Sequence, residues 1–83
     1  MTRYAAVMIV HGPLEDQDTV DRIESIRAAI DPYWHRSIGE DDRVTFLVDA
    51  AATSLVVAAV LDRIPERRHG YQWPVRVVPP SPF

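Results

Sequence analysis

Residues 43–64 read RVTFLVDAAATSLVVAAVLDRI and form the most apolar segment of the chain. Val44 to Ala50 is rich in β-branched and aromatic side chains, which predicts a strand buried on at least one face. Thr53 and Ser54 are good helix N-cap types, and the apolar residues after them predict a helix over Thr53–Ile64. Because this helix is apolar on most of its circumference, it needs cover on more than one side.

A second apolar run, Arg3–Val10, predicts another buried strand that ends at His11-Gly12-Pro13. The helix expected next begins near Asp16 or Asp18, either of which could cap it, and ends at Asp31-Pro32. Its apolar residues recur at spacings of three and four, as an amphipathic helix requires; they are Val20, Ile23, Ile26 and Ile30.

Two more polar segments predict the remaining strands. Tyr33–Ile38 carries two aromatic residues followed by polar ones, and it joins the strand from Val44 through a turn at residues 39–42, so the two should form a hairpin. Gln72–Val78 is the last strand, and its internal Pro74 confines it to a sheet edge.

The order strand, helix, strand, strand, helix, strand predicts an α+β domain over residues 1–78, followed by a Pro-rich extended tail at 79–83. We expect a ferredoxin-like split βαβ plait: a four-stranded antiparallel sheet in the order 4-1-3-2, with both helices on one face. This order puts the two most apolar strands in the middle. The alternative drops the strand at 33–38 and leaves a three-stranded βαβαβ sheet.

Composition narrows the classes of partner. The net charge of −3 and the pI near 5.4 argue against binding nucleic acid by bulk electrostatics. All nine basic residues are arginine, which favours a bacterial or phage origin with a GC-rich genome. No apolar run reaches the roughly 20 residues of a membrane span, and the N-terminus lacks a signal-peptide pattern, so the predicted location is the cytoplasm.

Catalytic and metal-binding signatures are absent from the sequence. It contains no nucleophile elbow, phosphate-binding loop or dinucleotide fingerprint, so no catalytic residue is assigned. No pair of histidines has metal-ligand spacing, and there is no cysteine. We therefore predict neither a metal nor a cofactor.

Charged groups should nevertheless gather at one end of the predicted plait. The residues with the strongest claim to a binding site there are His11, Glu40, Asp41, Asp42, Arg67 and Arg68. Two interpretations compete: a pocket for a small ligand or divalent cation built on His11, and a solvated set of mutually neutralised charges. The second is the commoner outcome for charged loops.

Two apolar surfaces are candidate interfaces. If Val44, Phe46 and Val48 face the helices, Thr45 and Leu47 face outward, where neighbouring strands could add Met8, Tyr33, His35 and Arg76. On the second helix, we expect Val57, Val60, Leu61 and Ile64 to face the sheet. The candidate interface residues are then Met8 and Leu47 on the sheet, and Leu55, Val56 and Ala59 on the helix.

The sequence therefore favours a small non-catalytic interaction or regulatory module that forms a homodimer or binds a host protein. A small core without disulfides makes self-association attractive, because a second subunit can cover apolar surface that the chain cannot. A ferredoxin-like enzyme or small-ligand module is the alternative. A nucleic-acid accessory protein comes third.

Overall fold

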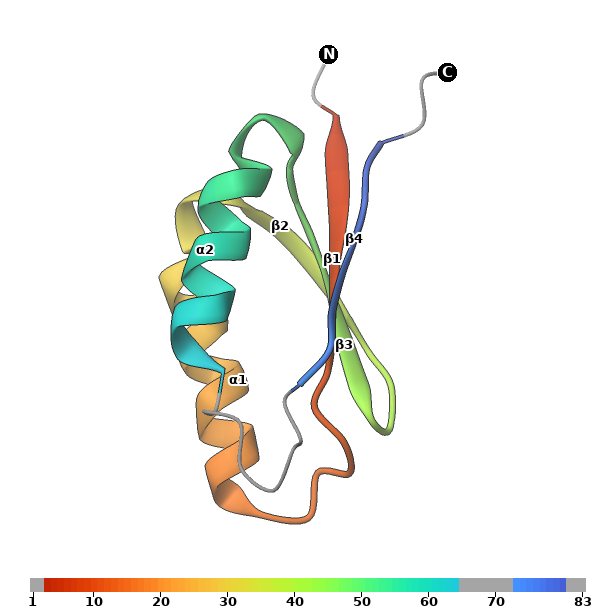
Figure 1. Cartoon of the computed structure of the whole chain (residues 1–83), viewed down its shortest axis with the longest axis vertical. Coiled ribbons are helices and arrows are strands. Elements are labelled where there is room, and N and C mark those ends of the chain that lie inside the picture. The colour runs from red at the N-terminus through yellow and green to blue at the C-terminus, as the bar shows by residue number, and fades with distance from the viewer. Residues whose placement is uncertain (1–2, 65–72, 81–83) are drawn as a thin grey trace.

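The computed structural model describes residues 3–64 and 73–80 as an α+β domain with a four-stranded antiparallel sheet and two helices (Figure 1). Its strands are β1 (Tyr4–Val10), β2 (Trp34–Gly39), β3 (Arg43–Asp49) and β4 (Val75–Val78). They lie in the order β2-β3-β1-β4, which is β4-β1-β3-β2 when it is read from the other edge. The strand at 33–38 therefore exists, and the three-stranded alternative is wrong.

Both helices, α1 (Gln17–Ala29) and α2 (Thr53–Arg63), cover the same face of the sheet (Figure 1). The residues at alternate positions of β1 and β3 are buried against them, because successive side chains of a strand point to opposite faces. The strands contribute Ala5, Val7, Ile9, Val44, Phe46 and Val48 to this core, and the helices contribute Ile26, Val56 and Val60. The sequence left open which face of the third strand is buried, and the structure shows that it is the face of Val44, Phe46 and Val48.

The helix starts differ in how they are capped. Asp16 accepts a hydrogen bond from the Thr19 amide at 2.8 Å and caps α1, as the sequence allowed. Thr53 and Ser54 were expected to cap α2, but the N-cap position is Ala52 and no side chain bonds there. A 3₁₀ turn, Ala50–Ala52, comes between β3 and α2, and Asp49 caps that turn through the Ala51 amide at 3.0 Å.

The second strand begins one residue later than expected. Asp31–Tyr33 forms a 3₁₀ turn, in which Pro32 supplies its fixed φ, and β2 starts at Trp34. Tyr33, expected on the outer sheet face, packs against the core instead. The Arg27 guanidinium lies 3.3 Å from the centre of the Trp34 ring and also bonds Asp31 at 2.8 Å, so the end of α1 is tied to the start of β2.

The final strand is shorter than Gln72–Val78. Trp73 is buried, the strand proper runs from Val75 to Val78, and Gln72 lies outside the described residues. In the described part of the chain, neither helix is long and apolar enough to cross a membrane.

Candidate functional site

The hairpin between β2 and β3 is tied to the residue that follows β1. The Glu40 amide donates to the Arg43 carbonyl at 2.9 Å and closes the hairpin, and the Gly12 amide donates to the Asp42 carbonyl at the same distance. Gly12 has a φ of +79°, a left-handed conformation that glycine adopts without the cost of a Cβ. This glycine therefore turns the chain out of the sheet while its amide holds the hairpin.

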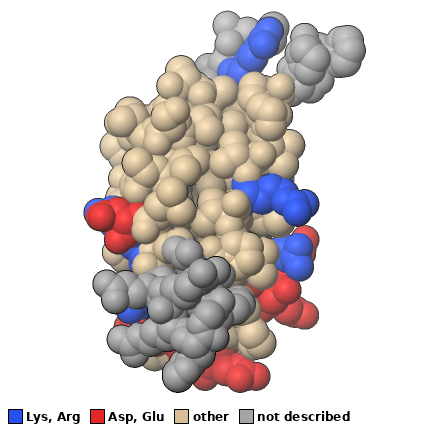
Figure 2. Space-filling view, viewed as in Figure 1, with Lys and Arg blue, Asp and Glu red and all other residues tan. Residues whose placement is uncertain are grey.

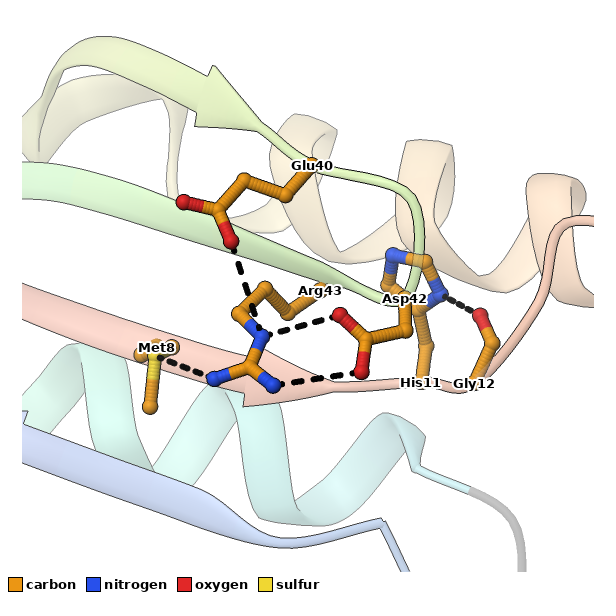
Figure 3. Close-up of polar contacts among 6 residues, drawn as sticks. All are labelled: Met8, His11, Gly12, Glu40, Asp42 and Arg43. Atoms are coloured by element: carbon orange, nitrogen blue, oxygen red, sulfur yellow. Dashed lines mark hydrogen bonds and ion pairs between the residues drawn. The ribbon is translucent and has the colours of Figure 1, made fainter.

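We call this region the hairpin end and define it by His11, Gly12, Glu40, Asp42 and Arg43 (Figure 3). Arg43 Nε bonds Asp42 Oδ1 at 2.9 Å, Arg43 Nη2 bonds Asp42 Oδ2 at 3.1 Å, and Glu40 Oε2 lies 3.7 Å from Arg43 Nε. The hydrogen bonds from Arg43 lower the pKa of Asp42 from its usual value, and the same bonds raise the pKa of Arg43. The Arg43 guanidinium is therefore already hydrogen-bonded to the Asp42 carboxylate and lies near the Glu40 carboxylate.

His11 continues the inward face of β1 and is only 6% exposed. Its Nδ1 is hydrogen-bonded to the Gly12 carbonyl, and its ring meets the Trp73 ring edge-on with centroids 6.1 Å apart. Because a carbonyl can only accept, Nδ1 carries the proton, and in the neutral ring the lone pair is on Nε2. His11 is thus a buried residue at the edge of the core.

The structure brings together only part of the predicted charged site. His11, Glu40 and Asp42 lie at the hairpin end, and the neighbouring Asp41 is exposed. Arg67 and Arg68 lie outside the described residues. Among residues 3–64 and 73–80, no three histidine or acidic side chains are grouped so that they could hold a metal ion. In the view of Figure 2, acidic side chains gather on the lower half of the molecule, which contains the hairpin end.

The lowered pKa of Asp42 predicts a loss of stability in acid. A carboxylate whose pKa is depressed by folding contributes stability above its unfolded value of about 3.8, and that stability is lost as the pH falls through the folded pKa. We expect Asp42→Asn to lower the melting temperature slightly at pH 7 and to have progressively less effect below pH 4. Thermal melts followed by circular dichroism between pH 7 and pH 2 would measure this.

Asp41→Asn is the matched control, because Asp41 is exposed and forms no side-chain hydrogen bond or ion pair with the described residues. Its melting temperature should follow that of the wild type at each pH. Equal effects of the two substitutions would show that the hairpin charges act only through the net charge of the domain.

The second candidate site is the sheet face that neither helix covers (Figure 1). Residues paired across antiparallel strands share a face, so the register identifies its side chains. We call this surface the open sheet face; its members are Tyr4, Ala6, Met8 and Val10 on β1, Arg43, Thr45, Leu47 and Asp49 on β3, Arg36 and Ile38 on β2, and Arg76 and Val78 on β4.

The centre of the open sheet face is apolar and its margin is charged. Ala6, Met8 and Leu47 are half-buried on the two central strands, and Ile38 and Val78 on the edge strands are 41% and 53% exposed. The charged groups Arg36, Arg43, Asp49 and Arg76 surround them. An apolar centre within a polar rim is the usual anatomy of a protein interface.

Part of this surface was predictable and part was not. Met8, Thr45, Leu47 and Arg76 lie on the open sheet face as the sequence suggested, and His35, also suggested, lies against its member Tyr4. Arg36, Ile38 and Val78 were missed, because their side depends on strand register. The register of β2 shifts at His35, between Trp34 and Arg36, and the His35 ring stacks on Tyr4 with centroids 4.2 Å apart.

The predicted stripe on α2 was right at Val60 and Ile64, which are buried, and wrong at Leu61, which is exposed. Val56 is fully buried, whereas Leu55 and Leu61 are 60% and 52% exposed. The helix is thus rotated from the expected phase, and Val56, Val60 and Ile64 face the core. Val56 cannot reach another protein from there, while Leu55 remains on the surface and Ala59 packs against the edge of the core.

No family model matches this chain, and no curated protein or solved structure matches it either. Its function is therefore inferred from the arrangement of its own residues.

Proposed function

We propose that this chain is a small non-catalytic interaction module, working in the cytoplasm, that docks onto protein through its open sheet face. The observation that carries the proposal is the apolar centre of that face: Ala6, Met8, Leu47, Ile38 and Val78 are grouped on four neighbouring strands, and neither helix covers them. Fully burying an aliphatic side chain contributes roughly 1.5–3 kcal/mol relative to full exposure, so even partial cover of this group favours association.

The architecture supports the same proposal. We infer that the domain is a ferredoxin-like split βαβ plait, because an antiparallel β4-β1-β3-β2 sheet with both helices on one side is the arrangement expected for it. Such a two-layer domain leaves one sheet face without a covering layer. In this chain that face is apolar at its centre, and a plait that functioned alone would gain solubility from polar residues there.

A small-ligand site at the hairpin end has less support. The Arg43 guanidinium already binds Asp42 through Nε and Nη2 and lies near Glu40, so a small ligand that needs a bidentate arginine would have to displace Asp42. His11 is mostly buried and supports the edge of the core.

Site-specific photo-crosslinking tests the docking surface in the cells that make the protein. A photoreactive amino acid at Ile38, on the open sheet face, should crosslink to protein, and Leu47→Glu should reduce that crosslink by tenfold or more. The reason is that a carboxylate at the apolar centre would be desolvated without a partner on docking. Gel electrophoresis and mass spectrometry would give the yield and identify the crosslinked protein.

Leu55→Glu is the matched control, because Leu55 is well exposed and lies on α2, on the opposite side of the sheet from Leu47. This substitution should leave the Ile38 crosslink unchanged. A crosslink that survives Leu47→Glu, or one that both substitutions weaken equally, would contradict the proposal.

A further inference from the structure

We propose that the occupant of the open sheet face is a second copy of this chain, packed face to face with its strands antiparallel to those of the first. The two-fold axis lies between the two sheets, perpendicular to the strands, and crosses between the Ala6–Leu47 pair and the Met8–Thr45 pair. This inference rests on the proposed function, because it names the partner of the same surface. The charge pattern and the side-chain sizes on the face both support it.

The strand register arranges the face in four rows across the sheet. Going from the start of β1 toward the hairpin end, the central pairs of these rows are Tyr4–Asp49, Ala6–Leu47, Met8–Thr45 and Val10–Arg43. Arg36 and Val78 extend the second row, and Ile38 and Arg76 extend the third. Glu40 follows β2 at the level of the fourth row, where its amide bonds the Arg43 carbonyl.

A two-fold axis through the middle of this array exchanges the first row with the fourth and the second with the third. Asp49 then lies opposite the partner's Arg43. Arg36 lies opposite the partner's Ile38, one row from the partner's Glu40 and within reach of its long side chain. Each of these oppositely charged pairs occurs twice, because a two-fold interface repeats every contact.

The groups that this arrangement brings together keep polar atoms that form no ion pair within the described chain. Arg36 forms no ion pair with any residue of the described chain. Asp49 uses Oδ1 to cap the turn before α2, and its other oxygen accepts no hydrogen bond from the described residues. Arg43 uses Nε and Nη2 for Asp42, but its Nη1 binds no carboxylate of the described residues and lies 4.0 Å from Met8 Sδ, on the side toward β1 (Figure 3).

The centre of the face is complementary in size under the same operation. Ala6 lies opposite the partner's Met8, so a small side chain faces a long and adaptable one at both symmetry-related positions. Leu47 lies opposite the partner's Thr45. Alternation of large and small side chains lets two sheets pack closely at the usual separation of about 10 Å.

The other simple arrangement, with the axis parallel to the strands, has no such complementarity. It exchanges β2 with β4 and β3 with β1, so Arg36 lies opposite the partner's Val78 and one row from the partner's Arg76. Asp49 lies opposite the partner's Tyr4 and gains no cation. Like charges placed together in an interface suppress association, so the perpendicular axis is favoured.

A charge exchange between two variants tests both the partner and the orientation. Arg43→Glu alone places a carboxylate opposite the partner's Asp49 at both sites, and Asp49→Arg alone places two guanidinium groups together. We expect each variant to self-associate at least tenfold more weakly than the wild type. An equimolar mixture should recover association, because both contacts in the mixed dimer then join opposite charges. Sedimentation velocity with one variant fluorescently labelled would measure this.

Mixing the two variants distinguishes a loss of assembly from a loss of folding. Asp49→Arg removes a cap and Arg43→Glu removes an ion pair, but mixing two poorly folded variants would not restore either fold. Arg36→Glu and Glu40→Arg provide a second pair at exposed positions, with the same expected recovery on mixing. Melting curves of all four variants show which pair to use.

Three results would overturn the proposal. A wild-type dimer that no single charge reversal weakens, or one whose variants do not recover on mixing, excludes the perpendicular axis. A wild-type chain that stays monomeric at hundreds of micromolar excludes the second copy as partner. In that case a Leu47-dependent crosslink from Ile38 to another protein would leave the proposed function standing, whereas failure of that crosslink removes the docking surface itself.

Discussion

Phe46→Ala should leave the domain largely unfolded at room temperature. Phe46 lies at the centre of β3, is 1% exposed and is among the largest fully buried side chains. Truncating a buried phenylalanine typically costs about 3–5 kcal/mol, through lost burial and the cavity that remains. A single core of about this size, without disulfides, rarely supplies more than about 3–5 kcal/mol of stability, so the substitution removes most or all of it. Urea denaturation followed by circular dichroism would measure the loss.

Leu55→Ala is the control for this substitution. Leu55 is also a large apolar residue, but it is exposed on α2, so its truncation should change the free energy of unfolding by less than about 0.5 kcal/mol. A loss below about 1 kcal/mol for Phe46→Ala would mean that the core is not organised around β3.

The two central strands were predictable because each is a nearly continuous run of apolar and β-branched residues. The buried face of β3 did not follow from its sequence, because Leu47 is as apolar as Val44, Phe46 and Val48, and only Thr45 marks the outer side. The polar character of the second and fourth strands, together with the proline before Val75, fixed them at the sheet edges. These local patterns were sufficient for the strand order.

The phase of α2 was not predictable from its own residues. An amphipathic helix shows its buried side by its polar residues, but this one is leucine, valine or alanine at every position from Leu55 to Leu61. The 3₁₀ turn Ala50–Ala52 leads directly into the helix, and the hydroxyl of Thr53, the first helix residue, donates to the Ala50 carbonyl at 2.7 Å. A turn of three alanines carries little information about its own geometry.

Only part of the open sheet face could be predicted from the sequence. The outward residues of β1 and β3 alternate with the buried ones within each strand, so Met8 and Leu47 could be named as candidates. The side chains that complete the face come from β2, whose register is shifted at His35, and from β4, whose pairing with β1 had to be known. Arg36 and Val78 are visible only when the four strands are aligned.

Val56→Asp should prevent stable folding, and Leu55→Asp should not. Val56 is fully buried in the core between α2 and the sheet, where a carboxylate finds no compensating partner. Burial of an unpaired charge costs more than about 3 kcal/mol of stability. If the aspartate instead stays protonated in the core at pH 7, its raised pKa costs a similar amount of stability. The expected result is a collapsed amide dispersion in the proton–nitrogen NMR spectrum and no cooperative thermal transition at pH 7.

The paired substitution at Leu55 makes this a test of helix phase and not merely of helix propensity. The two residues are adjacent on α2, and the same aspartate replaces an aliphatic side chain at each. Leu55 is 60% exposed, so its aspartate remains hydrated, and it lies in the first turn, where the helix dipole favours an anion. The dispersion and cooperative melting of Leu55→Asp should therefore resemble the wild type. If Leu55→Asp unfolded the domain and Val56→Asp did not, α2 would have the helix phase expected from the sequence, with Val57 and Leu61 facing the sheet. Val56 would then again be a candidate interface residue.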